Sequence, residues 1–225
     1  MHIKFLDFWH YKKISKIYNI IPFGHHCLPR IITTLNKFKP TKEFGEKSYP
    51  FDLCFSDFSS NVKFLENEFA NFYDEMEFDD NKKCWMNKKY NLILNHDNQS
   101  FEVLKERYDK RIANLYSALN DNERHIYFLI ATYKIINNND MEFFLDLINK
   151  YRSLESYSVI IINQSDVRFD FNLKKKIDVI DFTDDVLFPE MVKRGDWVRE
   201  LKKMKTRSAK KFNRRIKSEL SKIIK

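Results

Sequence analysis

The stretch YNIIPFGHHCLPRIITTL, residues 18–35, decides the fold. Its first part belongs to the segment 14–23, whose Ile, Tyr and Phe residues predict a buried strand. The turn Gly24-His25-His26-Cys27 follows, and Pro29 suits the first turn of a helix, where its missing N–H is not needed. Helical spacing then relates Leu28, Ile31, Ile32 and Leu35. The stretch therefore predicts strand, turn and helix, with Cys27 at the helix N-terminus.

The rest of the chain alternates between apolar runs and amphipathic segments. Strands are expected at 90–95, 125–131, 157–163 and 177–182, and helices at 57–72, 101–119 and 141–151. The apolar run SVIII at 158–162 is typical of a strand buried on both faces. Such alternation predicts an α/β fold, with a mostly parallel sheet of about five strands flanked by helices.

The formal charge of +8 is concentrated at one end of the chain. Residues 199–225 carry +10, which leaves residues 1–198 close to neutral at −2. We therefore expect a single α/β domain at 1–198 and a basic amphipathic C-terminal helix at 199–225. This helix would dock on the domain or contact an anionic membrane peripherally. Its single aromatic residue, Phe212, and the lack of a recognisable binding module argue against nucleic acid as a partner.

The cysteine pattern indicates a reducing compartment. Cys27, Cys54 and Cys84 are odd in number and have no paired spacing, and no secretory signal is recognisable in residues 1–10. We expect reduced thiols in the cytoplasm. No apolar run reaches the roughly 18 residues needed to span a bilayer, so any membrane contact would be peripheral, at the inner face.

The carboxyl ends of the expected strands define the candidate site, because ligands bind there in parallel sheets. The residues gathered at this edge would be Gly24–Cys27, His96-Asp97, Thr132-Tyr133, Asn163–Asp166 and Asp184-Asp185. A thiol at a helix N-terminus beside an imidazole is a candidate nucleophile, and His25, His26 or His96 could supply that imidazole to Cys27. The competing interpretation is a buried structural thiol.

Several short motifs resemble one bacterial family of unknown function, described as papain-like cysteine peptidases. They are the turn Pro22–Cys27, then Tyr49-Pro50-Phe51-Asp52, then the strand 90–95 closing on His96-Asp97, and then the helix with Arg107 and Arg111. The similarity covers roughly residues 17–133. It implies that Cys27 is the nucleophile and that His96 is the general base and acid. Relatives of this kind also suggest a role in bacterial surface-glycan assembly.

A third group should orient the imidazole. Chain order favours Asn163, with Asp166 as runner-up and Asp52 as a further alternative, although a buried Asp after Pro-Phe is more often a loop staple. Zinc is disfavoured because the adjacent His25 and His26 have no Cys-x-x-Cys pair to complete a ligand set, so no metal or cofactor is expected.

The leading expectation is thus a thiol-dependent hydrolase or acyltransferase using a Cys27–His96 pair. The alternative is a non-catalytic binding protein in which Gly24, His25 and His26 hold an anionic ligand at the helix N-terminus.

Overall fold

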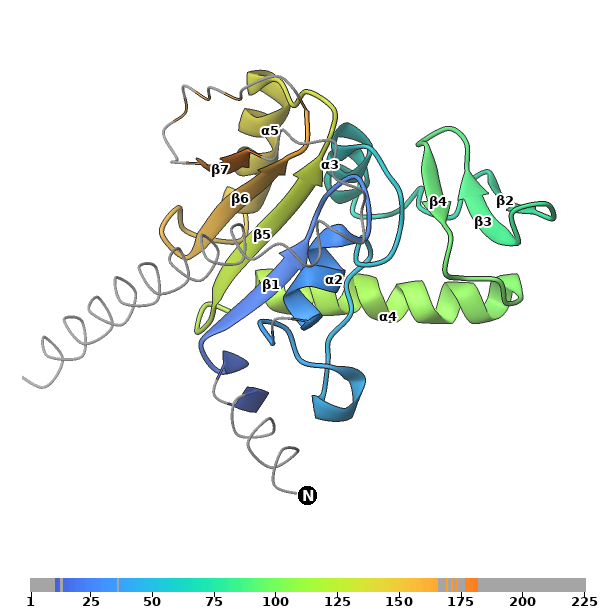
Figure 1. The fold of residues 1–225 in the computed structure, drawn as a ribbon, viewed down its shortest axis with the longest axis horizontal. Coiled ribbons are helices and arrows are strands. Elements are labelled where there is room, and N and C mark those ends of the chain that lie inside the picture. The colour runs from blue at the N-terminus through green and yellow to red at the C-terminus, as the bar shows by residue number, and fades with distance from the viewer. Residues whose placement is uncertain are drawn as a thin grey trace, which may run out of the picture. The chain divides into compact units, whose positions relative to one another are not determined.

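The computed structural model describes residues 11–12, 14–35, 37–165, 169, 171, 173 and 177–181 (Figure 1). Within these residues the alternating pattern forms a four-stranded sheet, whose neighbouring strands are all parallel. Its order is β1-β5-β6-β7, with bounds Tyr18–Pro22, His125–Thr132, Tyr157–Asn163 and Ile177–Asp181. The predicted α/β class is confirmed. The predicted tail at 199–225 lies outside the described residues.

Strand β5 is the centre of the sheet. Its register runs from Tyr18↔His125 to Pro22↔Leu129 against β1, and from Ile126↔Tyr157 to Thr132↔Asn163 against β6. All eight of its residues are buried, which explains why its sequence is almost continuously apolar.

Four α-helices and one short 3-10 helix accompany the strands in the described residues. Their bounds are α2 Leu28–Leu35, η1 Lys42–Phe44, α3 Phe58–Glu66, α4 Phe101–Leu119 and α5 Asn138–Asn149. The Ser100 hydroxyl caps α4 by accepting from Val103 N, and Asn137 caps α5 by accepting from Asp140 N. The aromatic centre of the core surrounds Phe23, whose ring contacts Phe51, Phe58, Phe128 and Phe144.

Three element boundaries differ from the prediction by three residues or more. Strand β1 begins at Tyr18, four residues later than expected, and α5 begins three residues earlier, after its Asn137 cap. Helix α3 ends at Glu66 and not at 72, because Glu68 and Phe69 adopt positive φ. The amide of Phe69 bonds the carbonyl of Phe64 at 2.7 Å and closes the helix end. Phe69 still packs into the core, and this burial had given the sequence its helical periodicity.

The strand predicted at 90–95 does not belong to the parallel sheet. Leu92–Leu94 forms β4, which pairs antiparallel with β3 (Cys84–Asn87), and β3 pairs antiparallel with β2 (Met76–Asp79). This second sheet is drawn in green in Figure 1. Only antiparallel neighbours can be joined by a link as short as the one between β3 and β4. The hairpin partners were not predicted because charged and turn-forming residues obscure their alternation.

Gly24 lies against the backbone of β5. A Cβ at this position would be 2.5 Å from Ala131 N and 2.6 Å from Ala131 O. The chain on either side is bonded to β5, through Phe23 N to Leu129 O at 3.0 Å and His25 N to Ala131 O at 2.8 Å. Residue 24 therefore cannot move away from the strand without breaking this pairing.

Replacing Gly24 by Ala should accordingly destabilise the fold by about 1–3 kcal/mol, because the clash is with backbone and no rotamer change relieves it. Urea denaturation measures the loss. Gly45→Ala is the matched control, since Gly45 has φ +76 with open space around its Cβ position and its substitution adds only backbone strain, about 1–2 kcal/mol. Full wild-type stability of Gly24→Ala would contradict the close approach.

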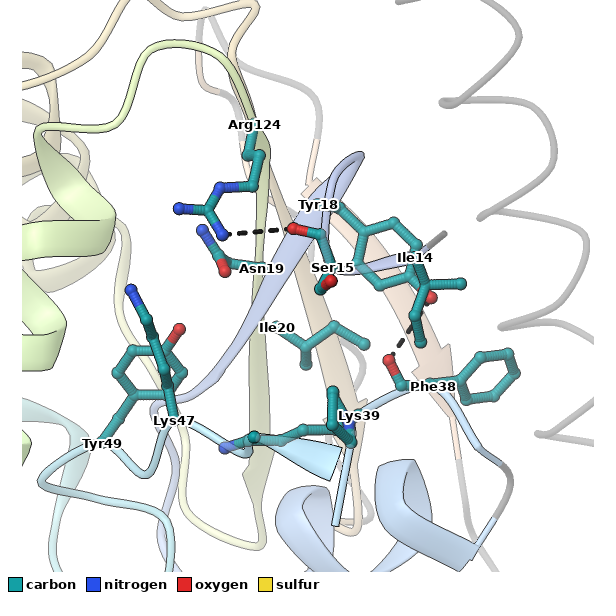
Figure 2. Close-up of a pocket in the computed structure, with 12 residues that line it drawn as sticks. Ile14, Ser15, Tyr18, Asn19, Ile20, Phe38, Lys39, Lys47, Tyr49 and Arg124 are labelled. Atoms are coloured by element: carbon teal, nitrogen blue, oxygen red, sulfur yellow. Dashed lines mark hydrogen bonds between the residues drawn. The ribbon is translucent and has the colours of Figure 1, made fainter. Parts of the chain in front are cut away.

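A pocket opens beside the amino-terminal part of β1, on the side of the strand that β5 does not cover (Figure 2). It is lined by residues just before β1, by the first residues of β1 itself, by Arg124 just before β5 and by the loop that follows α2.

Candidate functional site

The carboxyl edge of the parallel sheet brings together three segments that were expected there. The turn Gly24–Cys27 follows β1, Tyr133 follows β5 and Gln164 follows β6. Backbone bonds fix them, with Gln164 N donating to the carbonyl that ends β5 at 2.8 Å. Ser56 N donates to His25 O at 3.1 Å and ties the turn to the segment before α3. The prediction that these strand ends share one edge is confirmed.

His25 is paired with a carboxylate. Its Nδ1 lies 3.3 Å from Oδ1 of Asp57, the residue that precedes α3. Asp57 also accepts from Lys134 Nζ at 2.6 Å and from Asn91 Nδ2 at 3.0 Å. The Tyr133 ring packs against the imidazole in an edge contact, with the two ring centroids 4.0 Å apart. Asp57 favours the tautomer with its proton on Nδ1, so Nε2 of His25 is the nitrogen that can accept a proton.

Electrostatics keep this imidazole neutral. Burial lowers the pKa of His25 to about 4, and this effect exceeds the opposing attraction of Asp57. Burial acts to raise the pKa of Asp57, but the hydrogen bonds from Lys134 and Asn91 outweigh it and lower that pKa overall. At neutral pH the pair is therefore a carboxylate beside an uncharged imidazole.

His26 caps helix α2 with its side chain. Its Nδ1 accepts from Leu28 N at 3.2 Å, and its Nε2 lies 2.6 Å from Gln164 Oε1. These contacts fix the tautomer, because the nitrogen that accepts an amide proton cannot carry one. Burial lowers the pKa of His26, against the hydrogen bond with Gln164. The imidazole thus occupies the backbone N–H of Leu28, which an anion at this helix N-terminus would need. Pro29 has no backbone N–H to offer. The predicted anion site at Gly24, His25 and His26 gains no support from this arrangement.

Cys27 lies at the start of α2, as predicted, with its side chain 8% exposed. Burial raises the pKa of its thiol, although a bond from its own backbone N–H acts in the opposite direction. In the described part of the chain, no hydrogen bond joins Cys27 Sγ to an imidazole. The resting thiol is therefore protonated and lacks the charged partner of an ion pair.

The residues of the His96-Asp97 motif have different surroundings. His96 is exposed just after β4, where its Nε2 lies 3.4 Å from Asn95 Nδ2. Asp97 is buried and receives hydrogen bonds from Arg107 and from the Tyr108 hydroxyl. The structure does not bring His96 into contact with Cys27, because the strand that precedes His96 belongs to the antiparallel sheet.

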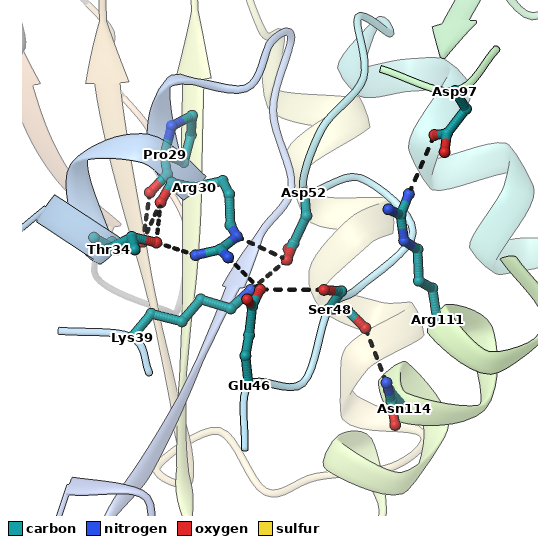
Figure 3. Close-up of polar contacts among 11 residues, drawn as sticks. Pro29, Arg30, Thr34, Lys39, Glu46, Ser48, Asp52, Asp97, Arg111 and Asn114 are labelled. Carbon is teal, nitrogen blue, oxygen red and sulfur yellow. Dashed lines mark hydrogen bonds and ion pairs between the residues drawn. The ribbon is translucent and has the colours of Figure 1, made fainter. Parts of the chain in front are cut away.

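Asp52 belongs to a buried network of charges (Figure 3). Its carboxylate bonds Lys39 Nζ and lies 3.5 Å from Arg30 Nε. Arg30 also pairs with Glu46, which accepts from the Ser48 hydroxyl at 3.1 Å. Two cations and two carboxylates thus neutralise each other around the loop that follows α2. Asp52 acts as a staple of that loop, and no contact joins it to a histidine within the described residues.

Asn163 is buried at the predicted edge, and its Oδ1 accepts hydrogen bonds from the backbone N and the hydroxyl of Ser165. It closes a turn after β6, and in the described residues no hydrogen bond connects it to an imidazole. The other predicted members of the edge, Asp166, Asp184 and Asp185, lie outside the described residues.

One residue of the observed site, Asp57, was not predicted from the sequence, where it is visible only as the start of an expected helix. Gln164 lies inside the segment Asn163–Asp166 that was expected at this edge, but its contact with His26 was not predicted. Asp57 and Gln164 are both loop residues beside a helix or strand end, where functional side chains concentrate. The available signal was therefore position, while nothing in the local pattern linked Asp57 to His25 or Gln164 to His26.

Known proteins give no independent assignment. Comparisons with family models, with curated proteins and with solved structures find no match to this chain. Among the described residues no group of three or more His, Cys, Asp or Glu could hold a metal ion. None of the helices described is both long enough and apolar enough to cross a membrane.

The lowered pKa of His25 predicts a pH-dependent stability. An unfolded imidazole titrates near 6.5, so between about pH 4 and 6.5 the unfolded chain binds more protons than the folded chain. The free energy of unfolding should therefore rise with pH across this window and level off above it. Urea denaturation at pH 5 and pH 7.5 should show a larger loss at pH 5 for wild type than for His25→Asn. Equal losses would show that His25 is not the group responsible.

Removing the Asp52 carboxylate should lower the free energy of unfolding far more than removing a surface carboxylate. Asp52→Ala leaves Lys39 buried without its carboxylate partner, and we expect a loss of about 3–5 kcal/mol in the free energy of unfolding. The control is Glu77→Ala, which breaks an exposed pair with Lys88 and should cost less than about 1 kcal/mol. Similar losses for both variants would contradict a stabilising role for the buried network.

Proposed function

We propose that the protein is a thiol-dependent hydrolase or acyltransferase in which Cys27 is the nucleophile and the His25–Asp57 pair is the general base. One observation carries this proposal. The carboxyl edge of the sheet holds a buried imidazole 3.3 Å from a carboxylate, two residues before a thiol at the start of a helix. A thiol nucleophile, an imidazole base and a group that orients the imidazole are the parts that thiol-dependent acyl transfer uses, and a carboxylate can serve as the third.

The protonation states decide how such a pair would work. A raised thiol pKa and a lowered imidazole pKa favour two neutral groups over a thiolate–imidazolium ion pair. His25 Nε2 would therefore take the Sγ proton while sulfur attacks the acyl carbon of the substrate. The imidazolium then returns that proton to the leaving group as the thioester forms. Water or a second acceptor, deprotonated by the same Nε2, cleaves the thioester and restores the thiol.

The surroundings of His25 support this role in two ways. Asp57 is held by Lys134 and Asn91, so the carboxylate that stabilises the developing imidazolium is itself fixed. Cys27 must turn toward Nε2 to react, which is compatible with a site that tightens only when substrate is bound. His26 is committed to capping α2 and holding Gln164, and it is thus less suited to moving a proton.

An activated ester tests the assignment. With p-nitrophenyl acetate, intact-mass and peptide analysis should find one acetyl group on Cys27 of the full chain. The same assay should find no adduct at position 27 in Cys27→Ser within the time needed to acylate wild type. His25→Asn should slow acylation by about 100-fold or more, since general-base assistance contributes about 10²–10⁴.

His96→Asn is the matched control, because it removes an exposed imidazole and should leave the acylation rate within about twofold. Folding of each variant is checked by circular dichroism. Acylation that depends on His96 and not on His25 would overturn the choice of base. Acylation at another residue, or none in wild type, would overturn the role of Cys27.

A further inference from the structure

A second candidate site lies at the other end of β1. The pocket shown in Figure 2 is lined by Ser15 and Asn19 around the start of β1, by Lys47 and Tyr49 from the loop after α2, and by Arg124 just before β5. The five residues of β1 rise about 3.3 Å each, which separates this pocket from the Gly24–Cys27 turn by roughly 15 Å. It is therefore distinct from the proposed acyl-transfer site.

Tyr49 gives this pocket a hydroxyl donor on a well-packed ring. The residue as a whole is 2% exposed, and it lines the pocket. Lys39 Nζ lies 4.7 Å from the ring centroid and helps to hold the ring in place. Burial is the largest influence raising the pKa of Tyr49, so its hydroxyl stays protonated and can donate.

Lys47 supplies a positive charge that no carboxylate among the described residues balances. It is half-buried and forms no ion pair with any described residue, whereas Lys39 pairs with Asp52 and Arg124 pairs with Asp121. None of the residues lining the pocket is acidic. The pocket thus keeps a net positive charge in a partly enclosed place, where charges interact more strongly than in open water.

Arg124 adds directed donors. Its Nε and Nη2 contact the Asp121 carboxylate, and its Nη1 donates to Ser15 O at 3.1 Å. A guanidinium has five N–H groups, so two remain after these three contacts. Figure 2 shows the ammonium of Lys47, the hydroxyl of Tyr49 and the guanidinium of Arg124 directed toward the same part of the pocket. The Asp121 contact holds the guanidinium in place before any ligand arrives.

From this convergence we infer that the pocket binds a phosphate group, either as free phosphate or as the monoester of a small organic molecule. Lys47 provides the charge, Tyr49 and Arg124 provide the directed hydrogen bonds, and the side-chain amide of Asn19 lines the same pocket. A tetrahedral dianion has enough acceptor oxygens for all of these donors, whereas a carboxylate has only two. Ile14 and Ile20 line the same pocket and can contact the carbon skeleton of a monoester.

Isothermal titration calorimetry of the full chain with inorganic phosphate tests the site. We expect saturable one-to-one binding that Lys47→Ala weakens by about tenfold or more, because a charge-assisted hydrogen bond is lost. Tyr49→Phe keeps the buried ring and should weaken binding severalfold. Lys110→Ala is the matched control, since it removes one exposed lysine charge from α4, outside the pocket lining, and should leave the affinity unchanged. Glycerol phosphate, run in parallel, separates free phosphate from a monoester by which of the two binds more tightly.

Circular dichroism establishes that each variant is folded before its affinity is compared. Binding that Lys47→Ala and Lys110→Ala weaken equally would reflect general charge attraction and would overturn the site. The site would also be overturned if chloride at the same concentration bound as tightly as phosphate. Failure of the wild type to bind either phosphate or its monoester would overturn it too. Because Cys27 is distant and is not needed for this assay, failure here leaves the proposed acyl transfer untouched, and failure of acyl transfer leaves this site untouched.

Discussion

The parallel pairing of β1 with β5 is the constraint on which the candidate site depends. The pairing continues beyond the strand itself, through Phe23 N to Leu129 O and His25 N to Ala131 O, and Gly24 is the residue that permits this close approach. The backbone of the turn is thus fixed before any side chain contributes. As a result, the imidazole of His25 and the thiol that follows it reach the edge of the sheet from a rigid position, which is what a precise arrangement of reacting groups requires.

Buried charges then hold the segments that surround this turn. Asp52 joins α2 to the loop at 39–52 through Arg30 and Lys39, and Asp97 joins the end of the antiparallel sheet to α4 through Arg107. Both carboxylates belong to motifs that looked catalytic in the sequence. A buried carboxylate with paired cations is costly to form and costly to break, so it specifies one arrangement of its loop. These ion pairs give Asp52 and Asp97 a structural role that requires no contact with a substrate.

The sequence predicted well what depends on local pattern. The buried strands, the start of α4 at its Ser100 cap and the gathering of strand ends around Cys27 all follow from periodicity and capping. It did not predict the partner of His25. The strand before His96 looked like a member of the parallel sheet, but its direction is set by a charged hairpin at 76–87 whose own pattern is weak. Asp57 reaches His25 only through the packing of α3, which no local pattern encodes.

Burial has opposite effects on the two titratable groups of the proposed pair, and this determines the chemistry available to them. Desolvation disfavours both the thiolate of Cys27 and the imidazolium of His25, so the neutral pair is the resting state. A stable ion pair would make the thiol reactive at all times. In the proposed reaction a neutral pair would make the thiol reactive only while a substrate is being attacked, when Asp57 would stabilise the imidazolium that forms. The same dry environment that keeps the thiol protonated at rest would then strengthen the Asp57–His25 attraction in the transition state of that proposed reaction, since charges interact more strongly where water is excluded.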